Sequence, residues 1–329
     1  MVWAALSSLW SPWDGETNVK IVAMLGLGLL FGSSVVTPQQ ARWTLAGASA
    51  ALLVLILLIV IEAMGDSSLN RAANPTAGEF AWTQNPARGA VVMLALLWPA
   101  TAWMLDSKAA WRWLAIASFL AGAVFVALQF DQLSNLLGLC IGAAFFAFGL
   151  AAPRLAILIP AFGLAAWLAM APFAMLAVVG AFQAPAWLPH SWDVRLGIWR
   201  YTSERALEQP WLGHGLDAAR SITEMTVYDG EALRVIPVHP HNASLQIWYE
   251  TGVIGVVLGV ALLVWLGLRL SRAYATARPQ AAAAAAVLAM FGAMANIGWS
   301  LWQEWWMATI ILAAILVAAL GNQTPRRNT

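Results

Sequence analysis

The chain has 329 residues, of which 61% are hydrophobic and only 10% are charged, and its mean hydropathy is +0.72. A soluble domain has roughly a quarter of its residues charged, so this composition excludes an ordinary water-soluble globular protein and indicates a membrane protein. The net charge of +1 does not point to nucleic acid, and the single cysteine, Cys140, excludes both a disulfide within the chain and a cysteine-based metal site.

Apolar runs along the chain predict about nine transmembrane helices, because a span needs about 20 mostly apolar residues. The runs cover residues 19–37, 43–64, 88–105, 111–130, 134–151, 155–181, 243–268, 280–300 and 305–321. We therefore expect an all-α polytopic membrane protein. It divides into an N-terminal transmembrane bundle at 1–181, a large loop at 182–242, and C-terminal helices with a short cytoplasmic tail at 243–329. Residues 1–10 are too short to span and could be the tail of a helix whose beginning is missing.

Two connections are longer than the others. The connection at 65–87 is rich in Asn, Pro and Gly and is expected to be irregular. The large loop is expected to be partly helical, with one helix over about 193–209 that Pro210 ends. A glycine turn, a second short helix over about 216–227 and an irregular stretch to residue 241 should follow.

Lysine and arginine are divided unevenly between the two sets of loops. One set holds Arg42, Lys108, Arg112, Arg154, Arg269, Arg272, Arg278, Arg326 and Arg327, whereas the short loops of the other set hold Lys20, Arg71 and Arg88. Because positively charged loops stay in the cytoplasm, the first set is predicted to be cytoplasmic. The large loop then faces the periplasm of a bacterial inner membrane.

The segment HPHNASLQIWYETGVIG, residues 239–255, joins the large loop to a membrane helix. Asn242 is a good N-cap because its side-chain oxygen can accept a backbone N–H of the first turn. His241 would feel the positive end of the helix dipole, which lowers its pKa and favours a neutral imidazole able to accept a proton. Gln246 and Glu250 lie four residues apart on one helix face, and a carboxylate inside a span needs a partner or a wet cavity.

The expected helix of the large loop carries several arginines. Arg195 and Arg205 fall on one face, and the planar guanidinium suits phosphate oxygens, so the pair is a candidate diphosphate clamp. Alternatively, Arg200 and Arg205 are surface residues paired with Glu204 or Glu208 at helical spacing. His241 could likewise be only a capping residue. A metal bound by His239 and His241 lacks an evident third ligand.

The spacing of His241-Asn242, then nine residues, Gly252, two residues and Gly255 resembles the signature of the O-antigen ligase and polymerase superfamily. The upstream RLGIW and PWLGHGL strings at 195–199 and 210–216 are similar to that family too. The resemblance implies a glycosyltransferase of about twelve spans that needs no metal and no nucleotide. Such enzymes move a glycan from undecaprenyl diphosphate, in the periplasmic leaflet, to an acceptor hydroxyl. The acceptor is a sugar of the lipid A core in ligases, or a second carrier-linked glycan in polymerases.

On this resemblance, His241 is expected to be the general base and Arg195 to stabilise the diphosphate, with Asn242, Gln246 and Glu250 lining or supporting the site. The chain departs from the family pattern at Asn135, where the family often has an arginine. Asn135 itself, Gln129, Arg88 or Arg205 are the candidates to supply the lost phosphate contact.

Other functions remain open at this point. They are a polymerase or protein-directed oligosaccharyltransferase of the same superfamily, a transporter of lipid-linked sugars, and an inactive scaffold. A transporter should have polar residues and broken helices near the middle of the membrane, whereas here the polar residues gather at the outer face. That distribution favours chemistry at the membrane surface.

Overall fold

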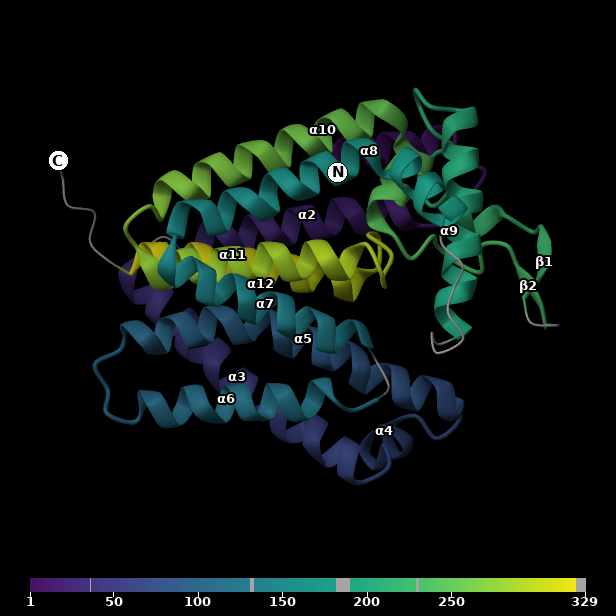
Figure 1. Ribbon diagram of the computed structural model, residues 1–329. Helices are drawn as coiled ribbons and strands as arrows, with labels where there is room; N and C mark the ends of the chain where they lie inside the picture. The colour runs from purple at the N-terminus through teal and green to yellow at the C-terminus, as the bar shows by residue number, and fades with distance from the viewer. Residues whose placement is uncertain (36, 131–132, 182–189, 229–230, 324–329) are drawn as a thin grey trace. The chain divides into compact units, whose positions relative to one another are not determined.

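The computed structural model describes residues 1–35, 37–130, 133–181, 190–228 and 231–323 (Figure 1). Arg326 and Arg327 of the predicted cytoplasmic tail lie outside these residues. Within the described part of the chain, seven helices are long and apolar enough to cross a membrane. They are α2 (Thr17–Ser34), α3 (Pro38–Met64), α5 (Gly78–Asp106), α7 (Leu133–Ala151), α8 (Pro153–Ala181), α10 (Ala243–Ala273) and α12 (Glu304–Asn322). The predicted all-α polytopic class is confirmed.

Two of the predicted spans are not among these seven helices. The run at 111–130 forms α6 (Arg112–Ala127), which has only 16 residues. The run at 280–300 forms α11 (Arg278–Ala295), whose first turn is Arg-Pro-Gln, and it ends five residues earlier than predicted. The count of nine spans therefore stays a prediction.

The remaining elements are short or lie in the large loop. They are α1 (Val2–Leu6), the 3-10 turns η1 (Ser7–Leu9) and η2 (Ala218–Ser221), α4 (Ser68–Ala73), α9 (His190–Glu208), and strands β1 (Met225–Tyr228) and β2 (Glu231–Arg234). The strands form an antiparallel hairpin in which Thr226 pairs with Leu233. In Figure 1, α9 and the hairpin lie next to each other at the ends of α8 and α10.

Two expectations about the loops are wrong. The connection at 65–87 is not irregular, because it contains α4 and the first ten residues of α5. Hydropathy detects only the apolar part of that helix, and its first turns are polar. The second short helix expected over 216–227 is instead η2 followed by β1, where β-branched Thr226 and Val227 suit a strand.

The chain forms two compact units, each assembled from segments distant in sequence. The first unit comprises residues 1–28, 161–266 and 295–308, and the second comprises 29–160, 267–294 and 309–329. The division of the chain at residues 181 and 242 stays a prediction.

In the first unit, α9 is fixed by an apolar face. Ile198, Thr202 and Ala206 recur every four residues and are fully buried, whereas Arg200 and Glu204 on other faces are exposed. The buried face packs in one cluster with residues of α8 and α10, including Leu168 and Trp248. The indole of Trp248 donates a hydrogen bond to the Leu168 carbonyl at 2.7 Å. The helix that carries Arg195 is thus packed against the helix that follows His241.

In the second unit, helices α3, α6 and α7 pack around α5, which is the most buried of the long apolar helices. Trp98 of α5 is buried against Phe146 of α7, with 5.5 Å between the ring centres. Small residues bring α7 and α11 close together, since a Cβ at Gly149 would lie 2.4 Å from the Ala282 Cα. The alanines at 281–286 are all buried, so α11 is covered on every side along this stretch.

Candidate active site

His241 lies in the loop directly before α10, in an unusual backbone conformation. Its φ is +55°, a left-handed value that non-glycine residues seldom adopt. The next residue, Asn242, caps α10 as predicted, because its Oδ1 accepts a hydrogen bond from the Leu245 N–H at 3.0 Å. The cap sets where the helix begins, and the left-handed turn sets the direction of the imidazole just before it.

One ring nitrogen of His241 has a fixed partner. Nδ1 lies 2.6 Å from the carbonyl oxygen of Gly298. A carbonyl can only accept, so Nδ1 carries the proton in this contact and the neutral ring presents Nε2 as an acceptor. Burial, and then the positive charge of Arg195, lower the pKa of His241 to about 4. The imidazole is therefore neutral at ordinary pH, as a general base must be.

The neighbouring histidine supports this loop. His239 is buried, with 4.1 Å between its ring centre and that of His241. Its Nδ1 accepts the His241 backbone N–H at 3.2 Å. Burial, then the charges of His241, Arg220 and Arg195, lower the pKa of His239 to about 2. His239 is thus a neutral residue that helps to hold the left-handed turn.

Arg195 lies close enough to both histidines to lower their pKa values. Its guanidinium donates one hydrogen bond to the Ser191 carbonyl at 3.0 Å and lies over the Trp192 ring, 5.5 Å from its centre. Nε is buried and has no hydrogen-bond partner among the described residues. No carboxylate in the described part of the chain forms an ion pair with Arg195, and burial lowers its pKa. Arg195 is thus a cation without an ion-pair partner in the described part of the chain, and its charge acts on His241, the predicted base.

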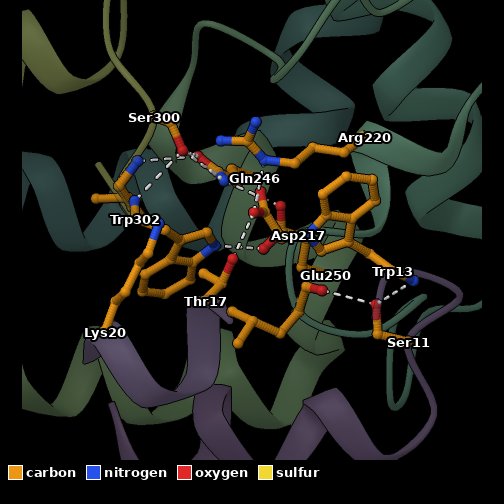
Figure 2. Close-up of polar contacts among 12 residues, drawn as sticks. Ser11, Trp13, Thr17, Lys20, Asp217, Arg220, Gln246, Glu250, Ser300 and Trp302 are labelled. Atoms are coloured by element: carbon orange, nitrogen blue, oxygen red, sulfur yellow. Dashed lines mark hydrogen bonds and ion pairs between the residues drawn. The ribbon is translucent and has the colours of Figure 1, made fainter. Parts of the chain in front are cut away.

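Gln246 and Glu250 form hydrogen bonds with Ser300 and Trp302, which closely follow Gly298 in the chain (Figure 2). The Gln246 amide donates to Glu250 at 2.9 Å and to the Ser300 hydroxyl at 3.0 Å, and its oxygen accepts the Leu301 N–H at 3.0 Å. Glu250 is fully buried and accepts the indole N–H of Trp302. The carboxylate therefore has the partners that its position inside a helix requires. Both side chains thus fix residues 300–302, next to Gly298, whose carbonyl orients His241.

Gly252, the first glycine of the spacing motif, lies at a break in α10. Gly252 has φ +61° and ψ −166°, so the helix is broken there. The segment 210–215 lies against the break: the Tyr249 carbonyl accepts the His214 N–H at 2.7 Å and the Glu250 carbonyl accepts the Gly215 N–H at 2.9 Å. The Val253 N–H donates to the Pro210 carbonyl at 2.7 Å. The PWLGHGL string therefore supplies hydrogen bonds that the broken helix lacks.

The other arginines of α9 are paired on the surface. Arg200 forms an ion pair with Glu204 at 3.1 Å, and Arg205 with Glu208 at 2.9 Å and Glu224 at 3.7 Å. The Glu208 hydrogen bond, and then the one with Tyr201, raise the pKa of Arg205. The surface pairing predicted as the alternative is present for both arginines, and Arg205 already has two carboxylate partners.

Arg88 and Asn135 belong to the second unit, where they lie near each other. The Asn135 amide donates to the carbonyl of Ala87 at 3.4 Å, and Arg88 donates to the Asn85 side chain at 3.5 Å. Asn135 is buried, and its Oδ1 has no hydrogen-bond partner among the described residues. A phosphate-binding role for these two residues stays a prediction.

Sequence reasoning missed Asp217 and Arg220. The Asp217 carboxylate is buried and accepts from Arg220 at 2.6 Å and from the Thr17 hydroxyl at 2.7 Å (Figure 2). This ion pair fixes Arg220, and its positive charge is one cause of the lowered pKa of His239. The signal was an Asp and an Arg three residues apart after the glycine turn. Gly298 was missed because the span was expected to continue to residue 300.

Within the described ranges, no group of three or more His, Cys, Asp or Glu side chains could hold a metal ion.

Fold and site together define a polytopic membrane protein with a polar, histidine-centred candidate active site at the mouth of a membrane helix. The family model for O-antigen ligase matches residues 118–260, which include Arg195, His241 and Glu250. Over these residues the chain is similar to the O-antigen ligase family, and the resemblance predicted from the sequence is confirmed for this part of the chain.

Curated relatives agree with the family. The chain is similar to candidate polysaccharide ligases of Rickettsia conorii (32% identical), Rickettsia felis (31%) and Rickettsia typhi (31%), each over 130 residues. The aligned segment is 38% of this chain and 31%, 31% and 32% of those relatives, so the match spans about a third of their length. No solved structure matches the chain significantly.

Proposed function

We propose that the chain is a ligase-type glycosyltransferase of the bacterial inner membrane. It moves a glycan from undecaprenyl diphosphate to an acceptor hydroxyl of the lipid A core, at the periplasmic face. The family match and the relatives described as polysaccharide ligases support the ligase class. The observation that carries the mechanism is the bond between His241 Nδ1 and the Gly298 carbonyl, which leaves Nε2 free to accept a proton.

The reaction needs one proton acceptor and a site for negative charge. His241 Nε2 takes the proton of the acceptor hydroxyl. At the same time the hydroxyl oxygen forms a bond to the anomeric carbon of the glycan. The bond from that carbon to the diphosphate oxygen breaks, and the electron pair leaves with the diphosphate. General-base help contributes about 10²–10⁴-fold to such a step.

In this proposal, Arg195 stabilises the diphosphate leaving group. It lies near His241, lacks an ion-pair partner in the described part of the chain, and is partly desolvated, which strengthens its attraction for a diphosphate. Arg220 lies on the His239 side, but its charge is balanced by the ion pair with the buried Asp217 carboxylate. Arg195 is therefore the cation that compensates charge as the diphosphate departs.

The sharpest test is His241→Asn in the full chain, expressed in a strain whose chromosomal copy of the gene is deleted. Asparagine tolerates a left-handed φ and can still donate to the Gly298 carbonyl, but it has no basic nitrogen. We expect normal membrane insertion, loss of capped lipopolysaccharide on gels, and accumulation of carrier-linked glycan. Normal capping by His241→Asn would remove His241 from the catalytic role.

Arg200→Gln is the matched control, because this arginine lies on α9 in an exposed ion pair. It should leave capping unchanged. The deletion strain also separates the members of the superfamily. Accumulated long carrier-linked polymer indicates a ligase, whereas surface glycans of a single repeat indicate a polymerase. Unchanged glycans in the deletion strain would contradict both.

A further inference from the structure

The second unit contains a cavity of about 800 Å³ that the proposed chemistry does not use. It is lined by the start of α3, the end of α5, and the connection between α10 and α11. Arg42, Lys108 and Arg278 contribute cationic side chains from these three places. The sequence assigns all three to the cytoplasmic side, and their meeting around one cavity agrees with that assignment.

The charge around the cavity is unbalanced. Arg42, Lys108 and Arg278 are exposed, and within the described ranges none of them forms an ion pair. Asp106 is the carboxylate among the lining residues, and it accepts a hydrogen bond from Gln280 at 2.7 Å. Three cations around one carboxylate repel one another unless an anion joins them.

Two further groups favour an anion at the same place. The 18-residue helix α11 begins at Arg278, so its unpaired N–H groups and the positive end of its dipole open onto the cavity. The side-chain Nε2 of Gln323, also in the lining, is buried with no hydrogen-bond partner among the described residues. This amide nitrogen can donate a hydrogen bond to a bound anion.

We propose that this cavity binds a phosphate group at the cytoplasmic face, either the headgroup of an anionic phospholipid or free phosphate. Guanidinium forks, an ammonium and a helix N-terminus are the groups that proteins use for phosphate. Basic pockets beside membrane helices on the cytoplasmic side bind anionic headgroups in the same way. The site is separate from His241 and does not depend on the proposed transfer reaction.

The test uses the detergent-purified full chain and two lipids, phosphatidylglycerol and phosphatidylcholine, with binding followed by native mass spectrometry. Wild-type protein should prefer phosphatidylglycerol. The double variant Arg42→Gln/Arg278→Gln should bind it about 30-fold more weakly, since each lost cation contributes several-fold to headgroup affinity. A parallel thermal-unfolding series with inorganic phosphate identifies the source: a shift with phosphate and none with phosphatidylglycerol indicates free phosphate.

The matched control is Arg154→Gln/Arg272→Gln, which removes two exposed arginines of the same predicted side that do not line the cavity. It should keep the wild-type preference, and Arg42→Lys/Arg278→Lys should keep it as well. Equal losses in both glutamine variants would assign the effect to general surface charge and overturn the site. Loss in the lysine variant, or no response of the wild type to either probe, would overturn it too.

Discussion

At the scale of single residues, His241 shows how a backbone conformation can select a tautomer. Its left-handed φ turns the ring so that Nδ1 meets the Gly298 carbonyl, and this leaves the opposite nitrogen unprotonated. The sequence predicted a neutral histidine from the helix dipole. In the structure the larger cause of the low pKa is burial, followed by the charge of Arg195.

A pH profile tests this electrostatic coupling. Transfer requires neutral His241, so wild-type activity should be lost only as pH falls through about 4, well below the ordinary imidazole pKa of about 6.5. Arg195→Gln removes a positive charge that lowers this pKa, so its acid limb should move to higher pH. It should stay below pH 6.5, because burial remains.

The same variant should also slow transfer by about 10²-fold or more at neutral pH, since one stabilising group for the leaving charge is lost. The measurement is initial transfer rate against pH in isolated membranes, for wild type, Arg195→Gln and the control Arg200→Gln. If Arg195→Gln loses activity at the same acidic pH as the wild type, the charge of Arg195 does not influence the pKa of His241.

At the scale of elements, the decisive feature is the break in α10. Gly252 has backbone angles that are essentially restricted to glycine, and segment 210–215 supplies hydrogen bonds to the opened turn. Gly213 completes this fit, because its own φ is +67° and a Cβ there would lie 2.6 Å from the Glu250 carbonyl carbon. Two glycine motifs separated in sequence thus form one backbone-to-backbone contact.

Gly252→Ala should therefore destabilise the first unit. A Cβ at residue 252 would lie 2.3 Å from the Trp211 carbonyl oxygen. The backbone strain alone costs about 1–3 kcal/mol. Thermal unfolding in detergent should show a lowered midpoint, with transfer reduced as well. The control is Gly163→Ala in α8, where an added Cβ meets nothing within 4 Å. Equal midpoints for the two variants would contradict the role of the break.

The sequence predicted some of these elements well and others poorly, for physical reasons. Capping by Asn242 and the pairing of Glu250 follow from local rules, and both are present. The break at Gly252 was not predicted, because an apolar run looks the same whether its helix is continuous or broken. The turn that carries Gly298 was also missed, because its residues were read as the end of a span. Its conformation depends on Gln246 and Ser300, which are 54 residues apart in sequence.

At the scale of the whole molecule, segments far apart in sequence build each unit. The first unit joins the N-terminal residues to α10 and to the large loop: the Trp3 indole donates to the Thr251 carbonyl of α10 at 3.0 Å, and the Ser11 hydroxyl to the Leu216 carbonyl of the loop at 2.7 Å. In the second unit, the Asn322 amide donates to the Val35 carbonyl at 3.0 Å. Composition alone could predict the membrane class but not this interleaving, which depends on contacts over more than 200 residues.

The orientation in the membrane can be tested directly, because the chain has one cysteine. In a Cys140→Ala background, Thr223→Cys places a thiol in the large loop and Thr276→Cys places one in the connection between α10 and α11; both positions are exposed. Arginines flank the second position, so the charge rule puts it in the cytoplasm and the first in the periplasm. A membrane-impermeant maleimide should label Thr223→Cys in intact spheroplasts and Thr276→Cys only after permeabilisation. The cysteine-free background should stay unlabelled, and the reverse pattern would place His241 on the cytoplasmic side, away from a periplasmic glycan donor.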